Sequence, residues 1–463
     1  MDLNYSGSGM IVYNKNEYTC DLYINKNQGG ILIKISVDNP IARFLELPVK
    51  IDFLNGELNT GYKFSLASCF RVKTENLLLS GKSIFSYQSR YLFQGVGGKG
   101  FDGIKLYKMV FQLSEIIEWG EITGYTVGEN HELLQKNDLT RNLFSDEEVR
   151  VQYFVNRDML PIDDTQLLKE EIILKQSGNI EISFKREEKF EKFESIFKKV
   201  KQLIEIATLK NVHLNKLTGW SKSVYIVHDE KRLEQAIDII SYDLKKDEKA
   251  LSSRQDLGRW IPLPELFRNN GFNKYFLKYE LLEPIIDLYL EILESTEMSA
   301  VRVFLNVVQA LETYHSRFIT NDIEKFKQRV ELEILKERPS AFLQKGREFL
   351  MANFHKYITL ESRLADLLFA KFEMIFDTGN IKFLDFPNVI AKTRNYYIHY
   401  DETIKIKGRV LTEEELSIYN RALFCILDYY FLLELGFSDA KQIQKKLYER
   451  WGSASQDLSL IKL

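Results

Sequence analysis

Apolar and polar side chains alternate along most of the first 185 residues, with the period of half-buried β-strands. The alternation is clearest over 31–37, 72–93 and 104–111, where aromatic and β-branched residues are frequent. Segments 172–175 and 180–185 flank Ser177-Gly178-Asn179, and they predict a β-hairpin that turns at those three residues. The whole region predicts a β-rich, sandwich-like fold.

The period changes to that of an amphipathic helix between residues 189 and 209, and a strand-like piece follows at 223–227. The last predicted helix begins with a capping box at Thr412 and Glu415, and Gly436 stands where a C′ glycine belongs. Helical spacing predicts helices over 231–245, 277–296, 299–318, 321–337, 340–353, 360–376, 386–401 and 412–435.

These patterns predict an α+β protein with a β-rich N-terminal domain over 1–250 and a helical region over 251–463. We expect the boundary between 230 and 255, around the charged stretch 245–256. The most apolar stretch runs from Phe424 to Leu435, but Asp428 and Glu434 interrupt it. We therefore expect a buried bundle helix there, since the stretch is too short to span a bilayer.

Charge and cysteine content narrow the class of protein. The 463 residues include 63 Lys and Arg against 66 Asp and Glu, a net charge of −3. This balance argues against a non-specific nucleic-acid coat protein, so a nucleic-acid partner would need a local patch or an assembled site. Three widely spaced cysteines and a start without a signal-peptide pattern predict a soluble cytoplasmic protein.

Two motifs have an ordinary structural interpretation beside a chemical one. Residues 95–100 fit G-x-G-x-x-G, but a strand pattern follows where a dinucleotide site needs a helix, which favours a hairpin loop. Glu312 and His315 form an E-x-x-H on a predicted helix, and a di-metal bundle would need a second copy that the sequence lacks. We expect a hydrogen-bonded structural pair, with metal binding as the alternative, and we predict no metal and no cofactor.

Arg394 and His399 are the strongest candidates for chemistry. Five residues apart on a helix, they lie about 140° apart around the axis and roughly 7.5 Å along it, so both can reach one bound group. Arginine is a permanent phosphate-binding cation and histidine transfers protons near neutral pH. With Asn395 beside them, they supply the parts for metal-free RNA cleavage. The alternative is that both side chains pair with carboxylates inside the bundle.

Residues 394–401, RNYYIHYD, resemble the R-x4-6-H signature of HEPN ribonucleases, in which a polar residue follows the arginine. The wider pattern of 304–318, 361–368 and 389–401 is similar to the ApeA-type HEPN domain, which would cover about residues 295–440. The β-rich first half with its amphipathic helix resembles the ApeA N-terminal domain.

The resemblance implies an all-α HEPN bundle and an endoribonuclease toxin that acts in prokaryotic anti-phage defence by abortive infection. Host RNA, with tRNA suggested, would be the substrate, and a phage-derived trigger would act through the N-terminal sensing or regulatory domain. HEPN domains generally work as dimers whose Arg/His helices face each other, so a homodimer or higher even-numbered homo-oligomer is expected, without a membrane partner.

The resemblance also implies roles for single residues. Arg394 would hold the scissile phosphate, His399 would be general acid or base, and Asn395 would help to orient them. Glu312 and His315 match a family helix and would have a supporting role. Tyr396 and Tyr397 flank the motif and would either pack in the core or stack on a base.

Two other function classes stay open from the sequence. One is a non-catalytic HEPN-like bundle that binds nucleic acid or a protein, with the β-rich domain as its recognition module. The other is a glycan- or ligand-binding β-sandwich fused to a structural bundle.

Overall fold

The computed structural model describes residues 4–25, 30–38, 47–77, 81–97, 104–114, 116–159, 173–228, 231–241, 260–295, 297–319, 359–368 and 385–451. The chain divides into two compact units. Unit 1 comprises residues 1–204 and 212–255, and unit 2 comprises 205–211 and 256–463. The charged stretch 245–256, where we expected the boundary, lies outside the described residues.

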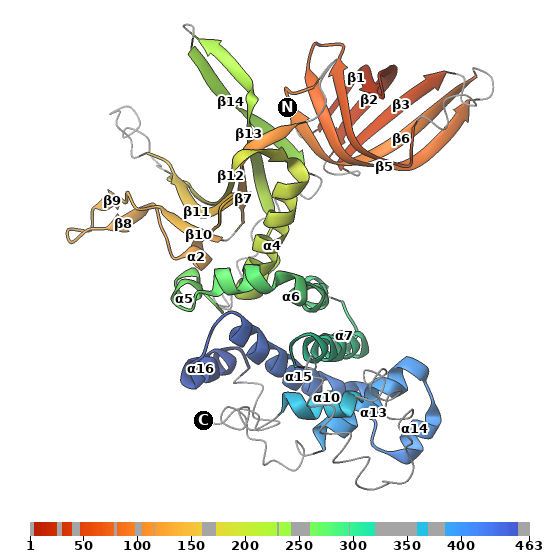
Figure 1. Ribbon diagram of the computed structural model, residues 1–463, viewed down its shortest axis with the longest axis vertical. Coiled ribbons are helices and arrows are strands. Elements are labelled where there is room, and N and C mark those ends of the chain that lie inside the picture. The colour runs from red at the N-terminus through yellow and green to blue at the C-terminus, as the bar shows by residue number, and fades with distance from the viewer. Residues whose placement is uncertain are drawn as a thin grey trace, which may run out of the picture. The chain divides into compact units, whose positions relative to one another are not determined.

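Unit 1 begins with a closed antiparallel barrel of six strands (Figure 1). Strand β6 pairs with both β3 and β5, which joins the two ends of the order β3-β2-β1-β4-β5. The β-rich prediction is confirmed, and these strands form a barrel where we expected a sandwich. Their bounds are β1 Asn4–Tyr13, β2 Asn16–Asn25, β3 Gly30–Asp38, β4 Lys50–Leu58, β5 Lys63–Leu77 and β6 Lys82–Gln94.

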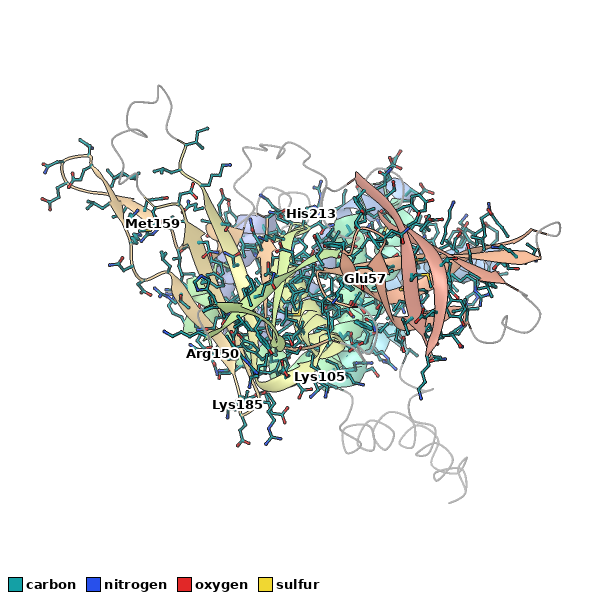
Figure 2. All side chains as sticks on the ribbon, turned by 90° about the horizontal axis from the view of Figure 1, so that it is seen from above. Glu57, Lys105, Arg150, Met159, Lys185 and His213 are labelled. Carbon is teal, nitrogen blue, oxygen red and sulfur yellow. The ribbon has the colours of Figure 1, made fainter. Side chains whose placement is uncertain are left out.

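Inward-facing aliphatic and aromatic side chains fill the barrel, among them Ile33, Leu66 and Phe85, each fully buried. Strands β1 and β4 approach each other closely at Gly9. A Cβ atom at Gly9 would lie 2.3 Å from the carbonyl oxygen of Glu57, so only glycine fits there (Figure 2 labels Glu57). The buried cluster around Ile33, Leu66 and Phe85 is the core of the barrel.

A second group of strands extends the same sheet from β14, which pairs with β6. The labelled Arg150 and Lys185 of Figure 2 lie on neighbouring strands β11 and β12. Helix α4 (Phe190–Thr208) covers this sheet, with Phe197 stacked on Phe111 of β7 at 3.9 Å. The strand bounds are β7 Lys105–Leu113, β10 Thr140–Ser145, β11 Val149–Arg157, β12 Gln176–Lys189, β13 Leu214–His228 and β14 Lys231–Ser241.

The predicted hairpin turn at Ser177-Gly178-Asn179 is wrong. These residues lie inside β12 and pair with Asn156, Val155 and Phe154 of β11. A Cβ atom at Gly178 would lie 2.5 Å from Cγ1 of Ile116 in α2 (Ile116–Gly120). The glycine therefore lets a helix pack closely on a strand, which leaves the same local signal as a turn. A separate two-stranded sheet pairs β8 (Tyr125–Val127) with β9 (Leu133–Gln135).

The predicted helix over 231–245 is also wrong, because residues 231–241 form β14 and pair with β13. Ile237 and Ile239 are both buried, at the spacing of two residues that a strand requires. Apolar residues at 233, 236, 237 and 240 satisfy the helical period as well. Pairing with the preceding strand β13 and, at its end, with β6 decided between the two, as context outside the segment commonly does. The strand at 223–227 and the helix at 189–209 are confirmed as parts of β13 and α4.

Unit 2 is helical, as predicted. Its described elements are α5 Leu263–Arg268, α6 Gly271–Glu294, α7 Ala300–Tyr314 with a π-helical turn η2 His315–Ile319, α10 Leu360–Leu367, α13 Phe386–His399, α14 Glu402–Lys407, α15 Glu413–Glu434 and α16 Ala440–Trp451. The helices predicted over 321–337 and 340–353, and residues 369–376 of another, lie outside the described residues.

Helix α15 is the core of unit 2. Its capping box is present, with Thr412 and Glu415 bonded reciprocally, and Gly436 has the positive φ of a C′ glycine. By length and composition alone, the helix is long and apolar enough to cross a membrane. However, 78% of its most apolar stretch is buried inside the protein. Its apolar surface is therefore used in packing on α6, α7 and α16.

A buried ion cluster fixes α16 to α15. Asp428 is fully buried, and its two carboxylate oxygens each lie 2.8 Å from Nη1 of Arg450. Trp451 and Tyr289 also donate to this carboxylate, at 2.7 and 2.8 Å. Burial raises the pKa of Asp428, while Arg450 and the two donors oppose that shift. Removing one partner of such a pair destabilises a protein by roughly 3–5 kcal/mol.

Candidate active site

Helix α13 positions the candidate residues. It begins after Asp385, with Pro387 in its first turn, although the Asp385 side chain makes no capping hydrogen bond. It ends where Tyr400 takes the left-handed conformation, and the Tyr400 amide donates to the carbonyl of Tyr396. Arg394 thus lies in the interior of the helix, and His399 occupies its last residue.

The side chains of α13 form two neighbouring strips. Arg394 and Ile398 are four residues apart and line the same hollow. Asn395 and His399 are also four apart, and both are exposed. Arg394 Nη1 donates to Oδ1 of Asn395 at 3.1 Å, which links the two strips. The His399 ring makes no hydrogen bond within the described part of the chain, so it is accessible to a ligand.

Glu312 of α7 forms an ion pair with Arg394. Its Oε2 lies 3.5 Å from Arg394 Nη2, and its Oε1 lies 3.9 Å from Nε of Arg363 on α10. The carbonyl of Glu312 also accepts from Arg363 Nη1 at 3.4 Å. One carboxylate therefore stands between two guanidinium groups, a net positive arrangement. Arg394 and Glu312 are each about one third exposed, so a phosphate can compete for Arg394.

His315 does not belong to this group. Its ring is 1% exposed, and Nε2 lies 3.0 Å from Oδ2 of Asp366 on α10. Glu312 and His315 thus have separate partners, and the expectation that they bond to each other is not met. Among the described residues, no three His, Cys, Asp or Glu side chains are placed to hold a metal ion. His315 fixes α10 against the end of α7.

Tyr396 and Tyr397 face the segment that follows α13. The hydroxyl of Tyr397 donates to the carbonyl of Leu411 at 3.1 Å, and burial raises the pKa of this phenol. The hydroxyl of Tyr396 donates to Glu402, and the Lys405 ammonium lies 4.3 Å from its ring centroid. Both tyrosines are half-buried; Tyr396 ties α13 to α14, and Tyr397 ties α13 to the segment between α14 and α15. Base stacking by either ring stays a prediction.

A hollow of about 450 Å³ opens beside Arg394, between α13 and the first three turns of α7. Asn306 lines it, and its Nδ2 atom is buried without a hydrogen-bond partner in the part of the chain that the structure describes. A buried donor left unpaired costs about 1–3 kcal/mol, so such groups usually have an acceptor from water or a ligand. The hollow is therefore lined by a residue whose amide nitrogen is unpaired among the described residues, on the helix that faces Arg394.

Sequence reasoning missed Arg363, Asp366 and Asn306. Arg363 and Asp366 are three apart in the segment 361–368, so their helical spacing placed them on one face. Nothing in the sequence showed which face met α7. Asn306 lies on the polar strip of α7 with Arg302, Gln309 and Thr313, and nothing in the sequence distinguished it from these polar neighbours.

The geometry supports acid–base and electrostatic chemistry at one place. An exposed imidazole can take or give a proton, and a guanidinium that is one third exposed on the same helix can bind an anion. The amide of Asn395 accepts from Arg394 and stands one helical turn before His399. These groups suit a reaction in which negative charge develops on a phosphate.

Comparison with protein families gives two matches. Residues 8–272 match ApeA N-terminal domain 1, and residues 305–441 match the Apea-like HEPN family. No curated protein and no solved structure matches the chain. HEPN domains are generally RNases, and these families suggest a nuclease-like module of anti-phage defence. The first match alone covers more than half of the residues, and the chain therefore belongs to the ApeA-type HEPN proteins.

Proposed function

We propose that this protein is a metal-independent endoribonuclease, with Arg394, Asn395 and His399 as its catalytic residues. The observation that carries the proposal is the exposed His399 ring on the same helix as Arg394, inside the residues that match the HEPN family. In abortive infection it cleaves host RNA, and tRNA is the substrate that the family suggests. The free, buried cysteines accord with a cytoplasmic location.

The reaction uses groups of the RNA and of this chain alone. A base, His399 in its neutral form, removes the proton of a ribose 2′-hydroxyl, whose oxygen attacks the adjacent phosphorus. Arg394 binds the phosphate oxygens as charge accumulates on them. The bond from phosphorus to the 5′-oxygen breaks, and an acid protonates that oxygen. The products carry a 2′,3′-cyclic phosphate and a 5′-hydroxyl.

A homodimer would supply the second proton-transfer group, since two α13 helices facing each other bring two His399 side chains to one site. Tyr400, which follows His399 directly in the chain, is 66% exposed, and Ile406 on the next helix, α14, is 85% exposed. Exposed apolar surface at such a place favours a protein contact. Replacing Ile406 with lysine should then lower the molar mass measured by sedimentation.

The test compares Arg394→Ala and His399→Ala with wild type at matched soluble expression. Arg421→Ala and His131→Asn are the controls, since Arg421 and His131 are exposed and lie outside α13. His131 has a positive φ, which asparagine tolerates. Growth during phage challenge and a gel of small RNA are the readouts. New tRNA fragments and arrest with wild type and both controls only would support the proposal.

Equal protection by all five proteins with intact RNA would favour the runner-up, a non-catalytic bundle that binds nucleic acid or a protein. One observation favours that alternative: Arg394 has a carboxylate partner, Glu312, as a purely structural arginine would. A phage protein or metabolite recognised by unit 1 would be the trigger in either case.

A further inference from the structure

The hollow beside Arg394 is the feature of unit 2 that the proposed reaction leaves unexplained. It has about 450 Å³ of space, within the roughly 300–1,000 Å³ of small-molecule sites. Two secondary-structure elements build it, since its lining comes from α7 and α13. The side chains that matter are Val301, Leu305, Asn306, Gln309, Arg394 and Ile398.

The lining combines apolar walls with two amides. Leu305 and Ile398 offer flat apolar contact, and Ile398 is 45% exposed. Gln309 is exposed at the rim, and the buried Nδ2 of Asn306 has no acceptor among the described residues. Amide side chains pair with the donor and acceptor edges of nucleobases, and apolar side chains contact base faces. No carboxylate is among the described residues that line the hollow.

Arg394 connects the hollow to the reaction. It lines the hollow, and it is the group that we propose to bind the scissile phosphate. The base attached to a nucleotide at that phosphate is covalently held within reach of the same opening. An unpaired base in an RNA loop can leave its stack and enter such a site, whereas a base in a duplex cannot.

We infer that this hollow is a nucleobase subsite, in which Asn306 and Gln309 hydrogen-bond the edge of the unpaired base next to the scissile phosphate. Leu305 and Ile398 contact the faces of that base. The inference rests on the proposed function, because it uses the phosphate at Arg394 to place the base. It makes the enzyme selective for RNA loops with one preferred base beside the cut.

The experiment uses the full chain with Asn306→Leu and Gln309→Leu, which keep side-chain size and remove the amides. Gln442→Leu on α16 is the matched control, a half-buried glutamine outside the hollow. The substrates are single-stranded oligoribonucleotides that differ only in one base beside the cut, plus one that is abasic there. Rates of cleavage are measured for each pair of protein and substrate.

Wild type and Gln442→Leu should prefer one base by at least tenfold over the worst. Both hollow variants should reduce that preference to about threefold or less. On the abasic substrate they should match wild type, because Arg394 and His399 are intact. An unchanged preference in both variants would overturn the inference while leaving the ribonuclease in place.

A binding measurement separates failure of the inference from failure of the proposed function. The probe is the best oligonucleotide with a 2′-deoxy sugar at the cut, which blocks attack, in normal and abasic forms. If wild type cuts no RNA but binds the normal form at least fivefold more tightly than the abasic form, only the catalytic proposal fails. Equal binding of both forms overturns the subsite. Unchanged base preference together with a lower molar mass in the hollow variants would instead assign the surface to contact between two copies.

Discussion

Two arginine–carboxylate clusters among the described residues of unit 2, one around Asp428 and one around Glu312, differ in burial, in distance and in the number of donors. Around Asp428 the ions are buried, Arg450 contacts both oxygens at 2.8 Å, and two further donors complete the shell. Around Glu312 the contacts are 3.5 and 3.9 Å long, and Arg394 is one third exposed. The first holds two helices together. The second can release Arg394 to a phosphate, while Arg363 remains beside the carboxylate.

The largest expected effect separates catalysis from stability on the helix that contributes Arg394 to the Glu312 cluster. His399→Ala should lower the rate of RNA cleavage by about 10²–10⁴-fold, the usual contribution of a general acid or base. Its free energy of unfolding should change by no more than about 0.5 kcal/mol, because the ring is exposed. Single-turnover kinetics and urea denaturation measure the two. If the free energy of unfolding fell by as much as the activation free energy of cleavage rose, His399 would not be separable from a structural residue.

The Asp428 cluster should affect stability rather than the rate of cleavage. Arg450→Met should destabilise unit 2 by roughly 3–5 kcal/mol, because it leaves Asp428 buried without its cation. Urea denaturation followed by tryptophan fluorescence is the measurement, since Trp451 is part of the cluster. Arg268→Met, whose side chain is 71% exposed, is the control and should change stability little. Equal effects of the two substitutions would contradict the account.

Double-mutant cycles sharpen the comparison to single pairs. Glu312→Gln with Arg394→Met should give a coupling energy of about 0.2–1 kcal/mol, the range of exposed ion pairs. Asp428→Asn with Arg450→Met should give a clearly larger value. A larger coupling for the Glu312 pair would mean that Arg394 is a structural residue.

The smallest effect concerns the capping box of α15, which belongs to neither cluster. The backbone amide of Thr412 and then the side chain of Arg409 lower the pKa of Glu415. A lowered folded pKa stabilises the protein above the ordinary value of 4.5, and this stabilisation disappears as the pH falls through the folded pKa. Glu415→Gln should therefore destabilise by about 1 kcal/mol or less at pH 7. Denaturation at a series of pH values should show the difference from wild type vanishing in acid.

Local signals predicted much of unit 2 and less of unit 1. Thr412, Glu415 and Gly436 marked α15 because caps are chemistry between near neighbours in the chain. Closure of the barrel depends on β3 pairing with β6, which no local pattern encodes. For the same reason Gly178 was interpreted as a turn, although it accommodates the distant helix α2. Residues 231–241 were interpreted as a helix because their apolar spacing fits both periods, and pairing with the preceding strand β13 and with β6 made them a strand.

The candidate site likewise combines residues that are close in the sequence with residues that only the fold brings together. Arg394, Asn395 and His399 lie within six residues and could be found together in the sequence. The contact of Glu312 with Arg394 joins positions 82 residues apart, and Arg363 joins them from a third helix. The spacing of Glu312 and His315 suggested that they would pair, but the turn at the end of α7 gives each its own partner.

The most direct test of the central claim is RNA cleavage by purified protein in a metal chelator, with the product ends analysed. We predict that wild type and His131→Asn produce fragments with 2′,3′-cyclic phosphate ends, and that Arg394→Ala and His399→Ala produce none above background. Cleavage that stops in the chelator, or that survives both substitutions, would contradict the assignment of Arg394 and His399 as a metal-independent ribonuclease site.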